Sequence, residues 1–167
     1  MAVMLCVGMH TRLTGKVKMA RSINEVAVAA LSRREHSLLE MRRKLKLKSF
    51  EEDEIDICLE TLIDNNLLSE ERFTESYINM RKRRGYGPGR IAQELRERGI
   101  DEYQYDDFLD RNNPDWQAIM RQQYCKKYGN QPAEDYTEKV KRAKHLQLRG
   151  FPLEWIFKLN SMDLDEF

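Results

Sequence analysis

Three segments of this chain repeat one pattern at a spacing of roughly fifty residues. In each, a leucine is followed by a basic residue, a small residue and a large apolar one, over 45–50, 95–100 and 146–151. Another large side chain follows five residues later, at Ile55, Tyr105 and Ile156. Such repetition is typical of stacked modules that share a continuous core and present a long surface to a long partner. The pattern favours a binding protein over an enzyme with a pocket.

Helix signals recur along the chain, and strand signals are nearly absent. A serine followed three residues later by a glutamate is the pattern of a capping box, and it occurs at Ser22, Ser37 and Ser49. These three signals predict helices over roughly 22–34, 37–48 and 51–65.

A second group of helices begins at Ser69 and turns at the glycine-rich stretch 85–89, where Pro88 suits the first turn of a helix. It continues to Gly99, a left-handed C-terminal cap position. Its first helix carries the apolar stripe Phe73, Tyr77 and Met80.

The third group starts near Pro114, with Trp116, Ile119 and Tyr124 expected inside. Its second helix carries the apolar positions Tyr136, Val140 and Ala143 and is capped by Gly150. We therefore predict an all-α fold of about nine helices, an elongated tandem array of three three-helix modules. The expected boundaries are an N-terminal extension over 1–20, modules over 21–66, 67–111 and 112–161, and an acidic tail over 162–167.

Charge alternates in step with the repeat although the formal net charge is only +1. Segments 31–49, 81–98 and 121–149 each carry a net charge of +5, whereas 50–75, 101–115 and 150–167 carry −9, −5 and −3. If the modules stack in one orientation, equivalent helices line up into a basic ribbon and an acidic one. The alternative is a set of solvated helix faces with no collective role.

The sequence offers no catalytic centre and predicts no metal, cofactor or small-molecule substrate. The glycines at 85–89 do not form G-x-G-x-x-G, because position 90 is arginine, and no hydrophobic strand precedes them. The histidines are scattered and lack metal-ligand spacing, at His10, His36 and His145.

The cysteines point to a reducing compartment, because they are three in number, far apart and without C-x-x-C spacing, at Cys6, Cys58 and Cys125. No apolar stretch approaches the roughly 20 residues of a membrane span, and the start lacks the features of a cleaved signal peptide. We expect a cytoplasmic protein.

Basic residues concentrate on the second helix of each module and before the glycine turn. A cation at a helix carboxyl end often only complements the helix dipole, yet three equivalent helices with several lysines and arginines exceed that need. Arginine favours bidentate contacts with carboxylate or phosphate. We predict a partner-binding site at Arg81, Lys82, Arg83, Arg84, Tyr86, Arg90, Arg42, Arg43, Lys44, Lys141, Arg142 and Lys144, with Gly85, Gly87 and Pro88 as the structural corner that shapes it.

These residues resemble the RecX family. In the first module the resemblance rests on Leu31-Ser-Arg-Arg-Glu-His-Ser37 with Glu40, Leu45 and Phe50. In the second it rests on Arg81-Lys-Arg-Arg-Gly-Tyr-Gly-Pro88 with Ile91, Glu94, Leu95 and Gly99, the most specific signature. In the third it rests on Lys126-Lys-Tyr128, Lys139 and Leu148-Arg-Gly-Phe151. The chain departs from the family pattern at Met41, where leucine is usual, and at Ser49, where glycine is usual.

The resemblance implies an all-α regulator of the RecA recombinase that binds RecA filaments on single-stranded DNA by lying in the filament groove. It further implies inhibition or modulation of RecA ATPase, strand exchange and co-protease activity in recombination, DNA repair and the SOS response. No catalytic residues are implied. Whether the basic helices touch RecA or DNA stays open, and weak nonspecific DNA binding fits either case.

Two other functions compete with this one. Three-helix units with a turn also resemble helix-turn-helix modules, so the chain can be a direct DNA-binding protein. The near-neutral net charge and the acidic segments oppose that interpretation. A generic helical-repeat scaffold is the third, although a period of roughly fifty residues does not suit tetratricopeptide repeats, which run to about 34.

Overall fold

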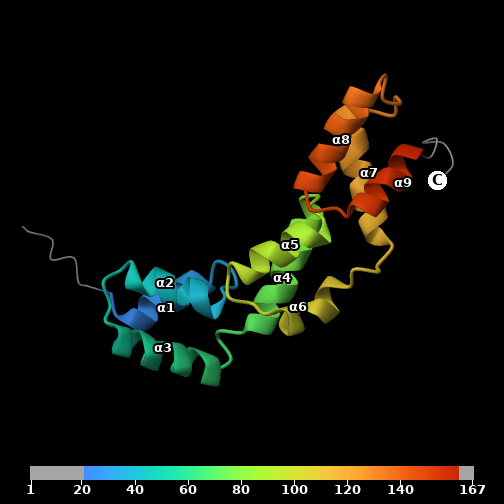
Figure 1. The fold of residues 1–167 in the computed structure, drawn as a ribbon. Coiled ribbons are helices and arrows are strands. Elements are labelled where there is room, and N and C mark those ends of the chain that lie inside the picture. Colours follow the sequence, from blue (N-terminus) through green and yellow to red (C-terminus); the bar gives the residue numbers. More distant parts are fainter. Residues whose placement is uncertain (1–20, 162–167) are drawn as a thin grey trace, which may run out of the picture.

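The computed structural model describes residues 21–161, and this part of the chain contains nine α-helices and no strand. The helices are α1 Ile23–Leu31, α2 Leu38–Lys46, α3 Glu52–Asp64, α4 Glu70–Arg83, α5 Pro88–Arg96, α6 Glu102–Leu109, α7 Asp115–Tyr128, α8 Tyr136–Leu148 and α9 Leu153–Ser161. They form three successive groups of three along an elongated molecule (Figure 1). The predicted all-α tandem fold is confirmed. The expected extension over 1–20 and tail over 162–167, with Cys6 and His10, lie outside the described residues.

The repeated sequence pattern corresponds to the carboxyl end of the middle helix in each module. Its small residue has a left-handed backbone, with φ of 64° at Ser49, 79° at Gly99 and 90° at Gly150. This conformation lets the chain reverse after the helix, and glycine adopts it at the least cost. The large apolar residue that follows is buried in the second and third modules, at Ile100 and Phe151.

The helix starts confirm one of the three predicted capping boxes and correct the other two. Ser22 and Glu25 cap each other's backbone as expected. The oxygen of Ser37 accepts from the Glu40 backbone at 3.1 Å, but the Glu40 carboxylate pairs with arginines instead of completing the box. The box predicted at Ser49 is wrong, because Ser49 is the left-handed residue that follows α2. The residue that caps α3 is Glu51, which forms a capping box with Glu54 three residues further on.

Three apolar clusters form the core. The first joins α1, α2 and α3 around Met41 and Ile55, and the second joins α4, α5 and α6 around Phe73 and Tyr105. The third lies among α7, α8 and α9 around Leu146. Trp116 lies in the first turn of α7 and was expected inside the third module. It is instead fully buried in the second cluster.

The continuous core expected from the repeat extends across only part of the molecule. Ile119 and Trp155 pack against both the second and the third clusters, so these two modules share apolar surface. No buried or half-buried apolar residue in 21–159 belongs to both the first and the second clusters. The first module is therefore joined to the rest by other contacts.

Two apolar positions of α8 also differ from expectation. Tyr136 is 81% exposed and Val140 is 47% exposed, while Arg142 and Leu146 occupy the buried face. Among the other predicted core positions, Tyr124 is buried and Ile119 is half-buried against the core. Tyr136 and Val140 thus face outward because a buried arginine takes their place, whereas Ala143 is half-buried and packs against the third cluster as expected.

The middle helices α2, α5 and α8 follow one another end to end (Figure 1). The hydroxyl of Ser37, which caps α2, donates to the carbonyl of Arg98 after α5 at 2.8 Å. The amide of Gly87, which caps α5, donates to the carbonyl of Arg149 after α8 at 2.8 Å, and Gly89 donates to Gly150 at 3.0 Å. The three helices therefore form one row, in which each carboxyl end meets the amino end of the helix before it in sequence.

Candidate partner-binding surface

The predicted corner between α4 and α5 lies where the second module meets the third. Gly85 has a φ of 76°, and Pro88 is the first residue of α5, as expected. A Cβ added at Gly87 would lie 2.6 Å from the backbone of Gly150, so only glycine fits there. The corner brings the chain after α4 into backbone contact with the chain after α8.

Tyr86 lies between two arginines at this corner. The guanidinium of Arg81 stacks 3.6 Å from the ring centre, and that of Arg149 lies 5.4 Å from it. Arg149 also donates to the carbonyl of Gly85 at 3.0 Å. Such cation–π contacts favour a fixed geometry when the groups are partly desolvated. Tyr86 thus organises the contact between two modules.

A buried carboxylate, Glu94, holds the second module together. It accepts hydrogen bonds from the Tyr77 hydroxyl and the Arg90 side chain, both at 2.9 Å, and pairs with Arg81. Burial alone would raise the pKa of Glu94, but the bonds from Arg90 and Tyr77 and the charge of Arg81 outweigh it, so the pKa is lowered. Burial and the bond to this carboxylate raise the pKa of Tyr77 to about 12. Arg81 is therefore committed to an internal ion pair.

Arg142 plays a similar part in the third module. Its guanidinium donates to the Tyr124 hydroxyl, the Gln131 carbonyl and the Glu138 carboxylate, each at 2.7 Å. The residue is only 4% exposed. A buried arginine that makes three such bonds stabilises the fold, and a partner could reach it only by displacing them.

Arg42 on α2 is tied to the acidic start of α3. Its guanidinium contacts Glu52 at 3.2 Å and Asp56 at 2.5 Å, and Lys46 pairs with the same glutamate. The basic stretch of the first module is thus partly neutralised by the acidic segment that follows it. Surface pairs of this kind contribute little to stability and leave the side chains able to exchange partners.

The remaining predicted cations are accessible. Lys44 and Lys82 are half-buried, and the Lys82 ammonium lies 4.4 Å from the centre of the Trp116 ring. The other six are exposed: Arg43, Arg83, Arg84, Arg90, Lys141 and Lys144. Of these six, only Arg90 has an ion pair within the described part of the chain, with Glu94. The structure thus divides the predicted site into arginines that are held by internal contacts, such as Arg81 and Arg142, and cations that are accessible. The role of the accessible cations in partner binding stays a prediction.

Two junction residues, Arg98 and Arg149, were not among the predicted site residues. Arg98 pairs with Glu40 of the first module at 3.2 Å, and Arg149 donates to the carbonyl of Gly85. Both occupy the position just before the left-handed residue of the repeat, where the first module has Lys48. A basic residue repeated at this position was the signal that would have singled them out.

Other kinds of site find little support in residues 21–161. No group of three or more His, Cys, Asp or Glu side chains there could hold a metal ion. No helix in that range is long and apolar enough to cross a membrane. Burial lowers the pKa of His36 and of His145, and nearby cations lower both further.

Comparison with known proteins identifies the family. Models described as the first, second and third three-helix domains of RecX match residues 25–62, 69–109 and 115–159. The Regulatory protein RecX of Pseudomonas fluorescens (strain SBW25) is 36% identical over 146 residues, which cover 87% of this chain and 94% of that protein. The chain belongs to the RecX family. The Regulatory protein RecX of Pseudomonas entomophila (strain L48) is 35% identical over 84% of this chain and 90% of its own.

Solved RecX structures share the fold. The crystal structure of RecX from Lactobacillus salivarius superposes with a TM-score of 0.66 at 22% identity, over 82% of this chain and 91% of that one. A second crystal structure, of regulatory protein RecX, gives 0.68 at 23% identity over 84% and 72%. The curated relatives are named regulatory proteins, and the two solved RecX chains share the fold of this chain.

Proposed function

We propose that this RecX protein binds RecA filaments on single-stranded DNA and lowers their ATPase, strand-exchange and co-protease activities. The observation that carries the proposal is the row formed by α2, α5 and α8, which runs the length of the molecule and bears exposed cations in each module. A long, segmented surface of this kind suits a helical polymer with repeated acidic groups better than a compact ligand. Family membership supplies the identity of the polymer.

The exposed arginines near the corner are the residues we assign to partner contact. Arg83 and Arg84 project from the end of α4, beside a turn that the third module holds in place. Arg81, one turn earlier, is held by Glu94. Arg83 and Arg84, which we assign to partner contact, therefore lie at the same helix end as Arg81, which we assign to the fold. The two roles can be tested by separate substitutions.

The helix-turn-helix alternative meets a geometric obstacle. In such proteins the amino-terminal residues of the recognition helix contact base edges in the major groove. Here the amino ends of α2 and α5 lie against the carboxyl ends of their neighbours. The amino ends of α3, α6 and α8 carry the acidic residues Glu52, Glu102 and Asp135, which repel phosphate. These observations favour a filament-binding protein over a duplex reader.

The decisive experiment compares Arg83→Glu/Arg84→Glu with the wild type in binding to RecA–single-stranded DNA filaments, bare single strands and bare duplex. We expect filament affinity to fall about tenfold or more, equivalent to about 1.4 kcal/mol, with a matching loss of ATPase inhibition. Arg33→Glu, an exposed charge reversal on the first module, is the control and should retain affinity.

Circular dichroism must show unchanged helicity in both variants. An unaltered filament affinity would remove Arg83 and Arg84 from the site. Equal or tighter binding of the wild type to bare DNA, with filament ATP hydrolysis unaffected, would establish a DNA-binding protein instead.

A further inference from the structure

His36 lies in the connection between α1 and α2, residues 32–37, where the first module meets the second. Its side chain is only 2% exposed. Its two neighbours in sequence both contact the second module: the Glu35 carboxylate pairs with Arg72 at 2.9 Å, and the Ser37 hydroxyl donates to the Arg98 carbonyl at 2.8 Å. The imidazole is therefore buried between two of the contacts that join the first module to the second.

The hydrogen bonds of His36 suit only the neutral ring. Its Nδ1 lies 3.0 Å from the carbonyl oxygen of Arg34, and because a carbonyl can only accept, Nδ1 carries the proton. The other nitrogen, Nε2, is buried and has no hydrogen-bond partner within the described residues. A second proton would turn Nε2 into a charged donor without an acceptor, which costs much more than an unpaired neutral acceptor.

The charges around His36 also disfavour a second proton. Burial of the ring lowers its pKa most, and the charges of Arg34 and, more weakly, of Lys44 on α2 lower it further. The bond to the Arg34 carbonyl and the charge of Glu40 on α2 act in the opposite direction but do not reverse the shift. The closed junction therefore holds His36 in its neutral form.

The two carboxylates nearest to His36 in sequence are already paired with cations of the second module. Glu35 pairs with Arg72 at 2.9 Å, and Glu40 pairs with Arg98 at 3.2 Å. These arginines are the charged groups that the second module contributes here. A protonated imidazole could gain a carboxylate acceptor only if one of these pairs broke. A proton on His36 is therefore either left without an acceptor or removes a contact between the modules.

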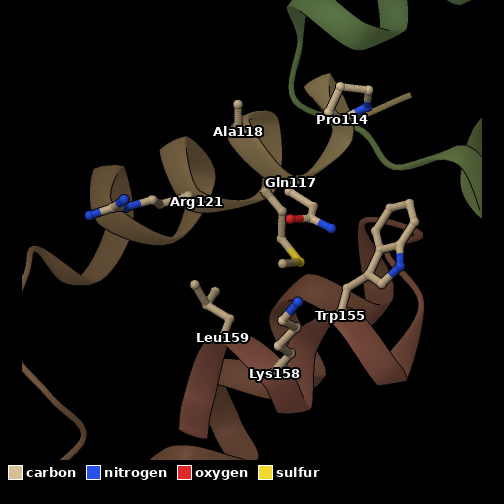
Figure 2. A pocket seen from close by; sticks show the side chains of 8 residues that line it. Pro114, Gln117, Ala118, Arg121, Trp155, Lys158 and Leu159 are labelled. Carbon is tan, nitrogen blue, oxygen red and sulfur yellow. The ribbon is translucent and has the colours of Figure 1, made fainter. Parts of the chain in front are cut away.

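The junction of the second and third modules provides a fixed reference. Ile119 and Trp155 pack against both apolar clusters. Trp155 on α9 and Pro114 at the start of α7 line the same space (Figure 2). The backbone amide of Gly87 donates to the carbonyl of Arg149 at 2.8 Å. Backbone and apolar contacts are not altered by a proton, so these two modules should keep their relative geometry when the first module moves.

We propose that His36 is a pH-dependent switch that holds the first module against the second when the imidazole is neutral and releases it when the imidazole is protonated. In the released form the charged ring leaves its buried position, and the contacts made by Glu35 and Ser37 are lost with it. The first module then moves as a separate body. No RecA is needed for this transition, so its test is independent of the filament assays.

The direction of the pH dependence follows from where the proton binds more tightly. In the open form the ring is solvated and has an ordinary pKa of about 6.5, whereas the pKa of His36 in the closed form is lower. The closed form is therefore fully favoured above about pH 6.5 and weakens as the pH falls below that value. A single proton changes the ratio of closed to open molecules by at most about tenfold per pH unit.

Distances between spin labels on the full chain test the switch at pH 7.5 and pH 5.5. One pair of labels spans the junction of the first and second modules, at Glu60→Cys on α3 and Ser76→Cys on α4, and both positions are exposed. A second pair spans the other junction, at Ser76→Cys and the exposed Lys139→Cys on α8. Both are placed in a Cys6→Ser/Cys125→Ser background. We expect the first distance to shift and broaden at pH 5.5 and the second to stay unchanged.

Variants of two histidines assign the response. His36→Gln, which stays neutral and can still donate to the Arg34 carbonyl, should keep the first distance unchanged at both pH values. His145→Gln is the matched control at the other junction and should respond as the wild type does.

A first distance that does not change with pH in the wild type overturns the proposal, as does a change that persists in His36→Gln. Circular dichroism must show the same helicity at both pH values. If helicity is lost at pH 5.5 together with both distances, the proton unfolds the chain instead of opening one junction, and the proposal is wrong.

Discussion

The two junctions between modules are built from different chemistry. At the junction of the first and second modules the contacts are made by side chains: the Ser37 hydroxyl on the Arg98 carbonyl, Arg72 with Glu35 at 2.9 Å, and Arg98 with Glu40 at 3.2 Å. At the junction of the second and third modules, glycine backbones touch directly and apolar side chains are shared by both cores.

This difference sets the mechanical character of each junction. Partly exposed ion pairs contribute roughly 0–1 kcal/mol each and weaken with salt. Close backbone contact and shared apolar burial do not depend on salt and resist deformation. The second and third modules should therefore move as one body, and the first should move relative to them. An elongated binder with one hinge can adjust its curvature to its partner and still keep most of its surface preorganised.

The largest effect is expected at the junction of the second and third modules, where glycine backbones touch. A Cβ at Gly150 would lie 2.2 Å from the Arg90 nitrogen, and the φ of 90° already disfavours any other residue. Gly150→Ala should lower the free energy of unfolding by about 3 kcal/mol, from backbone strain and overpacking together. Urea denaturation measures the change.

Gly129→Ala separates these two causes. Gly129 has a φ of 71° and a ψ of −161°, a backbone region essentially restricted to glycine, but no atom lies within 4 Å of an added Cβ, so only a backbone cost of about 1–3 kcal/mol applies. If Gly150→Ala costs no more than Gly129→Ala, close packing does not hold the second junction together.

The next largest loss of stability is expected at the junction of the first and second modules. Ser37→Ala removes both the α2 cap and the hydrogen bond to the Arg98 carbonyl, so about 2 kcal/mol should be lost. Ser22→Ala removes only a cap and should cost about 1 kcal/mol. The excess in Ser37→Ala measures the bond between the modules. Equal losses in the two variants would mean that this bond contributes nothing.

A smaller change in stability is expected when the pH is lowered, because His145 lies at the junction of the second and third modules. Arg149 donates to Nε2 of His145 at 3.2 Å, which requires a neutral imidazole. The pKa of His145 is lowered by burial and by the charges of Lys127 and Arg149. As the pH falls, His145 is therefore protonated in the unfolded state before it is protonated in the folded state. Its full contribution to the free energy of unfolding is present above the unfolded-state pKa of about 6.5.

As pH falls below about 6.5, the wild type should lose stability until the lowered folded pKa is passed. His36 is shifted in the same direction at the first junction, so the comparison must isolate one histidine. His145→Gln should lose less stability than the wild type in denaturation series between pH 7 and pH 5. Parallel curves for the two proteins would exclude His145 as the titrating group.

The smallest change is expected to stabilise. Ser49 has a left-handed backbone with a φ of 64° at the position that glycine occupies in the other two modules. Ser49→Gly should raise the free energy of unfolding by about 0.5 kcal/mol, because relief of the left-handed strain slightly exceeds the added chain entropy. Ser76→Gly, exposed within α4, should instead destabilise by about 0.5 kcal/mol. A loss of stability in Ser49→Gly would show that the serine is not strained.

The sequence was sufficient to predict the helices, their grouping and the caps at Gly99 and Gly150, because these depend on local spacing and on glycine. The capping box at Ser49 was wrong because the same serine suited two roles, and the cap of the preceding helix prevailed. Tyr136 and Val140 were wrongly expected inside because Arg142, which has the sequence pattern of a surface cation, finds three partners inside the module. Long-range partners of this kind, like the Glu94 pairs and the two junctions, are not visible in local periodicity.

The end-to-end row of α2, α5 and α8 also gives the molecule a polarity. At each junction the partial negative charge of one helix end meets the partial positive charge of the next, so these charges cancel within the row. Two ends of the row have no neighbouring helix in the described part of the chain: the amino end of α8, which Asp135 caps, and the carboxyl end of α2, where Lys48 stands at the position that Arg98 and Arg149 fill elsewhere. A polymer that itself has two distinct ends can then distinguish one orientation of the bound molecule from the reverse.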